Sequence, residues 1–339
     1  MTPRFLPKDE LPRLLQSALA GCQVFGPSRT EGDVHLRPLA TCDVEFAPAR
    51  TVEPLKALLF GPRYDLGDCF EPDTPAAAGK RAVLGVAACD LAALDVLDHV
   101  FLGGDYVDPG YQTARENLLI VSADCTEPRD SCFCTFSGRK PYTEGGFDLN
   151  LSSVTAGYLI EAGSERGRIL LEKAGAALPD ASGGQVRERD ARRADVTRRV
   201  QEAVAAIGLG TVDGMLEAVR DGEEHAVWDE LAEKCVECGA CNFICPTCHC
   251  FLLVDLEARE GFRRFRNWDA CVYPAFAREA SGANPRARRA QRLHGRLEKK
   301  YHFIKADAGV WGCVGCGRCV EACAGRIDMR EALKELANA

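Results

Sequence analysis

Two runs of cysteines near the C-terminus have the residue type and spacing of iron–sulfur ligands. The first run is Cys235-Val-Glu-Cys-Gly-Ala-Cys-Asn-Phe-Ile-Cys245, and the second is Cys313-Val-Gly-Cys-Gly-Arg-Cys-Val-Glu-Ala-Cys323. Both read C-x2-C-x2-C-x3-C. In such runs three closely spaced thiolates bind one cubane cluster, and the fourth cysteine reaches the other cluster. The repeat therefore predicts two [4Fe-4S] clusters in one domain.

The same rule divides these cysteines into two crossed ligand sets. One cluster takes Cys235, Cys238, Cys241 and Cys323, and the other takes Cys313, Cys316, Cys319 and Cys245. Three glycines lie between the ligands and let backbone N–H groups approach the sulfurs, since no side chain intervenes: Gly239, Gly315 and Gly317. Two zinc sites are the alternative, but zinc needs two C-x2-C pairs per site rather than two identical four-cysteine runs.

A second group of cysteines lies upstream. Cys89 follows a predicted strand, and Cys125, Cys132 and Cys134 lie in the loop after the next strand. Neighbouring strands of a parallel sheet end at the same edge, so these four thiols are expected to meet there. The arrangement predicts a third four-thiolate site, iron–sulfur rather than zinc, although buried packing cysteines are the alternative.

Three more cysteines, Cys248, Cys250 and Cys271, lie between the two runs. They form no set of four ligands unless His249 or another cysteine joins them. A further cluster, a zinc site and a cluster with only three cysteine ligands all remain open. The isolated Cys22, Cys42 and Cys69 are expected to be packing residues.

The four upstream cysteines need a sheet that brings them together, and we expect an α/β domain over residues 1–220 to provide it. The apolar pattern predicts strands at 82–87, 118–121, 158–161 and 169–172, with a helix that Asp90 caps and that runs to about Phe101. The segment 179–193 is rich in Gly, Ser and charge, and it predicts a loop before an amphipathic helix at 195–207.

The two cysteine runs require a second domain, which we expect over residues 221–339. It should be mainly α-helical, with a helix at 222–233 leading to the first run and an inserted helical layer between 246 and 312. The arginine-rich stretch 262–301 could dock an acidic partner, offset the clusters' negative charge or form a solvated helix face.

Composition excludes several other classes of protein. The chain has 339 residues, 18 cysteines and a formal net charge of −8, which disfavours nucleic acid as the main partner. No signal-peptide pattern and no apolar run long enough for a membrane span occur, so we expect a cytoplasmic protein with reduced or metal-bound thiols. Dinucleotide and phosphate-loop motifs and a Ser/His/Asp constellation are missing, so no catalytic residue is predicted.

Three segments resemble the family that contains the electron-relay subunit of anaerobic sulfite reductase and the sulfhydrogenase (nickel-iron hydrogenase) β-subunit. They are Cys-Pro-Thr-Cys-His-Cys-Phe at 245–251, Trp-Asp-Ala-Cys at 268–271 and Cys-Val-Gly-Cys-Gly-Arg-Cys at 313–319. The segments 88–91 and 132–134 are similar to it too. The second domain would then be a ferredoxin-like dicluster domain.

The resemblance implies an electron-relay subunit of a hetero-oligomer. It would pass electrons between a flavin-containing, NAD(P)H-reacting subunit and a catalytic subunit, either a nickel-iron hydrogenase or a sirohaem sulfite reductase. Two other hypotheses stay open at this point. The chain could be a zinc-stapled scaffold, or it could itself reduce a small substrate at a three-cysteine cluster.

Overall fold

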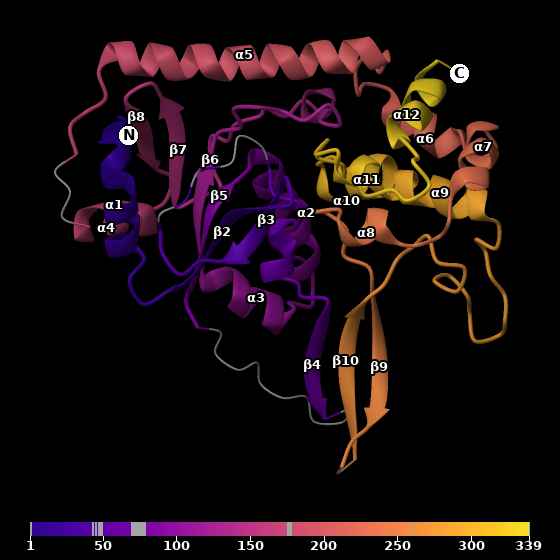
Figure 1. The fold of residues 1–339 in the computed structure, drawn as a ribbon. Helices are drawn as coiled ribbons and strands as arrows, with labels where there is room; N and C mark the ends of the chain where they lie inside the picture. The colour runs from indigo at the N-terminus through magenta and orange to yellow at the C-terminus, as the bar shows by residue number, and fades with distance from the viewer. Residues whose placement is uncertain are drawn as a thin grey trace.

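A mixed seven-stranded sheet forms the core of the N-terminal region (Figure 1). The computed structural model describes residues 2–338 except 43, 45, 47–49, 69–78, 175–177 and 260. The strand order is β1-β8-β7-β6-β5-β2-β3, with parallel pairing between β2, β5, β6 and β7 and antiparallel pairing at both edges. The strands are β1 (Arg4–Pro7), β2 (Gln23–Thr30), β3 (Asp33–Pro38), β5 (Arg81–Val86), β6 (Leu118–Ala123), β7 (Leu149–Val154) and β8 (Gly157–Ala162).

The predicted α/β pattern is largely confirmed around β5 and β6. Helix α2 (Ala88–Leu102) follows β5, but its N-cap is Ala87 and not Asp90. Asp90 lies inside the first turn, buried, and accepts a hydrogen bond from the Leu55 backbone N–H at 3.2 Å. The other helices of this region are α1 (Leu11–Ala18), α3 (Pro109–Glu116), α4 (Glu165–Lys173) and the short 3-10 helices η1 (Lys8–Glu10), η2 (Leu55–Leu58) and η3 (Cys134–Ser137).

Two predictions after β8 are wrong. Residues 169–172 are helical, within α4, because Ser164 caps the segment and accepts a hydrogen bond from the Gly167 N–H at 3.0 Å. The segment 179–193 is a loop only at its start. A capping box between Ser182 and Gln185 begins the long helix α5 (Gly183–Ile207). This helix includes the one predicted at 195–207.

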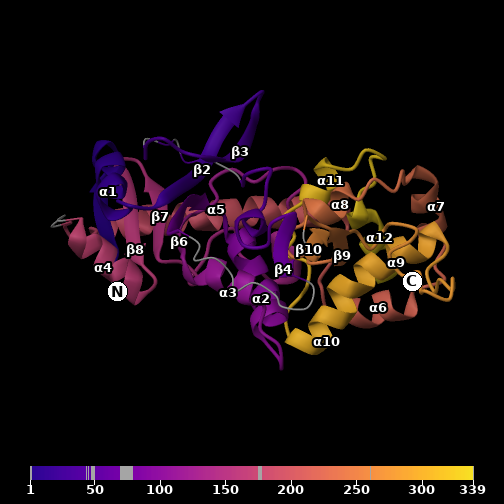
Figure 2. The same ribbon diagram turned by 90° about the horizontal axis from the view of Figure 1, so that it is seen from below.

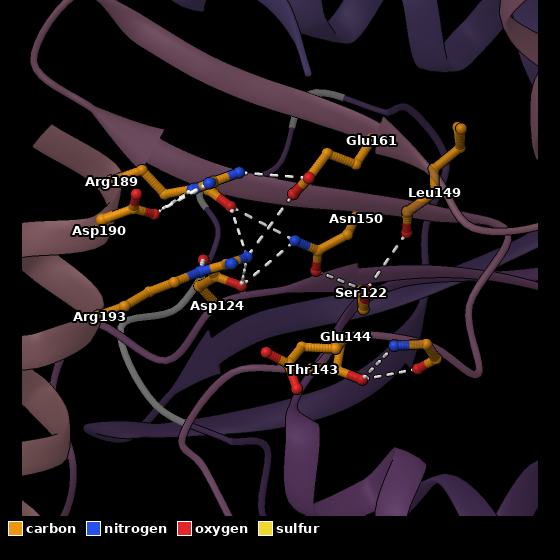
Figure 3. Close-up of polar contacts among 12 residues, drawn as sticks. Ser122, Asp124, Thr143, Glu144, Leu149, Asn150, Glu161, Arg189, Asp190 and Arg193 are labelled. Atoms are coloured by element: carbon orange, nitrogen blue, oxygen red, sulfur yellow. Dashed lines mark hydrogen bonds and ion pairs between the residues drawn. The ribbon is translucent and has the colours of Figure 1, made fainter. Parts of the chain in front are cut away.

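Helix α5 is held to the end of the sheet by partly buried ion pairs (Figure 3). Arg193 donates from Nε to the Asp124 Oδ2 at 2.7 Å, and Arg189 lies 3.2 Å from Glu161. Asn150 also donates to the Asp124 carboxylate at 3.2 Å. Because Asp124 directly precedes Cys125, this network fixes the start of the N-terminal cysteine loop.

The C-terminal region consists mainly of short helices around the two cysteine runs (Figures 1 and 2). Trp228, Leu293, Tyr301 and Leu333 belong to its buried core. The predicted helix at 222–233 corresponds to α7, which begins later. The elements are α6 (Met215–Asp221), α7 (Val227–Lys234), α8 (Ala240–Phe243), α9 (Arg289–Glu298), the π-helical turn η4 (Lys299–Phe303), α10 (Ile304–Ala308), α11 (Arg318–Glu321) and α12 (Met329–Ala337).

A β-hairpin protrudes from this region where an inserted helical layer was predicted (Figure 1). Strands β9 (Phe251–Glu257) and β10 (Phe262–Trp268) pair with each other, and β10 also pairs with β4 (Arg63–Asp68). The prediction is therefore wrong for this segment, and only the part from α9 onward is helical. In the described part of the chain, no helix is both long and apolar enough to cross a bilayer.

Candidate metal centres

The first ligand set comes together around one cavity. Cys235, Cys238, Cys241 and Cys323 line it, and Cys319 reaches its edge. The run leaves the end of α7, turns at Gly239 with φ +74° and enters α8. A Cβ on Gly239 would lie 2.7 Å from the Tyr273 hydroxyl, so close packing as well as access to sulfur requires glycine there. Cys238 is the exposed member of the set.

The second ligand set surrounds a neighbouring cavity. Cys313, Cys316, Cys319 and Cys245 line it together with Tyr301 and Leu333. The structure thus brings together both crossed sets that the spacing predicts. In the described ranges, no three His, Cys, Asp or Glu side chains converge on the position of a single metal ion.

Burial favours the neutral thiol form of Cys241 and Cys316. It raises the pKa of Cys241 to about 12, and it does the same for Cys316. Metal coordination removes a thiol proton outright, so a bound cluster would supply the driving force for ionisation that water cannot supply here.

Two buried cations, Arg296 and Lys300, line the cavities, and a third, Lys56, contacts the Cys248 carbonyl. Lys56, Arg296 and Lys300 are each at most 4% exposed, and in the part of the chain that the structure describes none pairs with a carboxylate. Arg296 donates from Nη2 to the Cys241 carbonyl at 3.1 Å, while its Nε is buried without a partner. Burying an unpaired cation is costly, so these side chains suit an anionic occupant.

The arginine-rich stretch is divided between two roles. Arg296 is buried beside the cavities, where it can offset cluster charge, and Arg292 is buried against Glu237. By contrast, Arg264 lies on the hairpin and pairs with Asp255 at 2.7 Å. Lys56 was missed by sequence reasoning, because it comes from an N-terminal 3-10 helix that is far in sequence from both cysteine runs.

Three of the N-terminal cysteines lie close together after β6, and Cys89 shares a cleft with one of them. Cys89 lies in the first turn of α2, and Cys125 and Cys134 each lie close enough to Cys132 for their charges to interact. Cys89 and Cys134 line one surface cleft. Burial raises the pKa of Cys125 and Cys134 to about 12. Strands β5 and β6 pair in parallel, as expected, and a shared site of all four thiols stays a prediction.

The N-terminal cysteine loop packs directly against the second run. Phe133 N–H donates to the Gly315 carbonyl at 2.8 Å, and the Cys132 thiol lies 3.9 Å from the Cys316 carbonyl. A Cβ on Gly315 would lie 2.5 Å from the Cys134 nitrogen, and one on Gly317 would overlap the Ser131 carbonyl. These glycines are thus required by a loop contact that sequence reasoning did not foresee.

The extra trio also forms a group. Cys250 and Cys271 are in side-chain contact, and so are Cys248 and Cys245. The Asn242 amide connects the pairs, with Nδ2 3.0 Å from the Cys271 Sγ and 3.9 Å from the Cys248 Sγ. His249 instead packs its ring against Phe101.

The isolated cysteines lie away from these groups. Cys42 is buried in the core around β5 and β6, and Cys22 packs at the edge of that core. Both are packing residues, as predicted. The third, Cys69, lies outside the described residues.

Comparisons with known proteins point to the same chemistry. The 4Fe-4S dicluster domain family matches residues 234–327. The chain is also similar to the sulfhydrogenase 2 subunit beta of Pyrococcus furiosus, with 30% identity over 322 residues that cover 93% of this chain and 92% of the relative.

Proposed function

The chain belongs to the sulfhydrogenase beta-subunit family and is an iron–sulfur electron-transfer subunit, and on that basis we propose the path and the partners of its electrons. It relays electrons between a flavin-containing, NAD(P)H-reacting subunit and a catalytic hydrogenase subunit. The observation that carries this proposal is the similarity to a hydrogenase beta subunit along nearly the whole chain. A sulfite reductase partner is the second candidate, and the experiment below separates the two.

The relay uses three cubane clusters. Two occupy the cavities of the dicluster domain, residues 221–339, with the ligand sets described above. The third is held by Cys89, Cys125, Cys132 and Cys134. Two contacts support a continuous path: Cys319 borders both cavities, and the Cys132 loop packs on Cys316. When bound, each cluster supplies one-electron chemistry.

The protein's own residues set the conditions for that transfer. Buried cations such as Lys300 favour the reduced, more negative state of a neighbouring cluster, and the apolar walls exclude water from it. The exposed Cys238 brings the first cavity to the surface, where a partner's redox centre can approach. The reduced, cytoplasmic compartment suits a chain with this many thiols.

The protruding hairpin is the surface on which we expect a partner subunit to dock. Its edge strand β9 exposes Phe251, Leu252, Leu253 and Leu256 together. A continuous apolar edge strand is unusual for a monomer and typical of an interface. The hairpin begins directly after Cys250 and ends shortly before Cys271, so docking there places a partner next to the cysteine-rich region.

Anaerobic purification from the native host with a tag on this chain tests the proposal. We expect at least about twelve iron atoms per chain, four from each of these three cubanes, and co-purification of a nickel-iron large subunit and a flavoprotein. A sirohaem protein in their place would move the chain to the sulfite reductase branch. Stoichiometric zinc without iron would overturn the relay and leave a zinc-stapled scaffold.

A further inference from the structure

Three cysteines lie around the Asn242 amide at the base of the hairpin. Cys250 directly precedes β9, and Cys271 follows shortly after β10. Asp269 N–H donates to the Cys250 carbonyl at 3.0 Å and extends the strand pairing to this point. Pairing of the hairpin is therefore what brings the Cys250 and Cys271 thiols into contact.

A buried amide is directed at the sulfurs of this site. Asn242, 1% exposed, places Nδ2 3.0 Å from the Cys271 Sγ and 3.9 Å from the Cys248 Sγ. An N–H donor stabilises a thiolate more than a thiol, because the charged sulfur is the stronger acceptor. The same kind of contact tunes sulfur ligands in metal centres.

Two of the buried cations belong to the same site. Lys56 Nζ donates to the Cys248 carbonyl at 2.9 Å, and Lys300 Nζ donates to the Thr247 hydroxyl at 2.7 Å. Both ammonium groups are almost fully buried, and neither pairs with a carboxylate within the described residues. This buried positive charge therefore suits an anionic group in the site.

We propose that Cys248, Cys250 and Cys271 bind a further [4Fe-4S] cluster through three thiolates, with a water-derived ligand on the remaining iron. The three cysteines bind as thiolates, and the negative charge of the occupied site offsets Lys56 and Lys300. This inference rests on the proposed electron-transfer function and adds a centre to it.

The number of protein ligands follows from where the other cysteines lie. Cys245 is the nearest, but it lines the second cavity with Cys313, Cys316 and Cys319 and completes that set. Of the other cysteines that the structure describes outside the predicted clusters, Cys22 and Cys42 pack in the N-terminal core. A cluster with one iron not bound by cysteine is the result.

Iron analysis of the complete chain, purified anaerobically, tests the site. Cys250→Ser and Cys271→Ser should each lose about four iron atoms per chain relative to the wild type, whereas the matched control Cys22→Ser should lose none. Brief exposure of the wild type to air should release the iron that lacks a thiolate and give a three-iron EPR signal, which both variants lack. Far-UV circular dichroism and the remaining cubane signals check that the variants fold.

A second variant keeps all three thiols. Asn242→Ala should retain the iron. It should lower the reduction potential of the cluster whose EPR signal is lost in Cys250→Ser, because an N–H···S bond favours the more negative, reduced cluster. Unchanged iron and unchanged potentials in all of these variants would overturn the inference, as would loss of zinc in place of iron. Only a wild-type chain without any iron would overturn the proposed relay as well.

Discussion

Arg318 of the second cysteine run forms a buried ion pair with Asp90 of helix α2, with Nη2 2.7 Å from the Asp90 Oδ2. The Arg318 side chain is 1% exposed and the Asp90 side chain 4% exposed. The same guanidinium donates from Nε to the carbonyls of Thr51 and Val52. A buried ion pair therefore links helix α2 of the N-terminal region to the second run in the interior of the molecule.

Replacing Asp90 by Ala should destabilise the protein by about 3–5 kcal/mol, because Arg318 would stay buried without its counter-charge. Anaerobic urea unfolding of wild type and variant measures the difference. Asp307→Ala is the control, since Asp307 pairs with His99 at the surface and should contribute little. Equal losses in the two variants would argue against a special role for the buried pair.

Gly317→Ala should weaken the junction between the N-terminal cysteine loop and the second run. Its Cβ would collide with the Ser131 backbone, and alanine adds about 1 kcal/mol of strain at a positive φ. Gly309→Ala is matched in backbone, with φ +71° against +73°, but has nothing within 4 Å. Both variants share the backbone strain, so we expect a larger fall in melting temperature for Gly317→Ala than for Gly309→Ala and loss of iron only in Gly317→Ala, measured by thermal unfolding and iron assay.

Lys300→Met should lower the reduction potential of the neighbouring cluster, because a buried positive charge favours the reduced state. A tenfold change in the equilibrium corresponds to about 59 mV for one electron, and we expect a shift of that order. EPR-monitored redox titration measures it. Lys305→Met is the control, since that ammonium bonds the Gly309 carbonyl at the surface. Identical titration curves for Lys300→Met and the wild type would contradict the charge-compensation argument.

Glu53, which directly follows Thr51 and Val52, makes the stability of the protein depend on pH. Burial alone would raise the pKa of its carboxyl, but hydrogen bonds from His35, Leu36 and Arg37 outweigh burial and lower it from 4.5 to about 2. A depressed pKa means that the stabilisation is complete above 4.5 and is lost as pH falls toward 2.

The difference in unfolding free energy between wild type and Glu53→Gln should therefore be constant from about pH 7 to about pH 5.5 and shrink below about pH 4.5. Urea unfolding at each pH measures it, with iron content checked in parallel. A difference that grows on acidification would contradict this sign.

Replacing Leu252 and Leu256 together by Ser should reduce co-purification of partner subunits about tenfold or more while leaving the iron content unchanged, because both side chains lie on the exposed edge strand. Quantitative mass spectrometry of the purified complex measures the effect. Tyr106→Ser, at an exposed aromatic elsewhere on the chain, is the control and should have no effect. Intact partner binding by the double variant would show that the hairpin is not part of the interface.

The features that could be predicted from the sequence are those encoded locally. Cysteine spacing within each run predicts which thiols share a cavity, because a tight loop fixes the directions of its own side chains. The helix at 165–173 was missed, because a short apolar run does not distinguish strand from helix, whereas the cap at Ser164 does. The hairpin was missed for a similar reason.

The contacts that Lys56, Asp90 and Asn242 make with the cysteine-containing segments are tertiary, so they could not be predicted from the sequence. Lys56 and Asp90 reach the cysteine runs from more than a hundred residues upstream, and no local pattern indicates that a lysine in a 3-10 helix will be buried against Cys248. Arg318 could have been noticed, since a charged residue stands between two ligands in a run that must be buried.

The exposed strand β9 also affects how long the subunit survives in the cell that makes it. A free, apolar strand edge is a template for aggregation and a target for chaperones and proteases, so a copy without a partner would be short-lived. If a partner docks on the hairpin, as we propose, the amount of this subunit is tied to the amount of that partner, and the hairpin acts as a check on stoichiometric assembly.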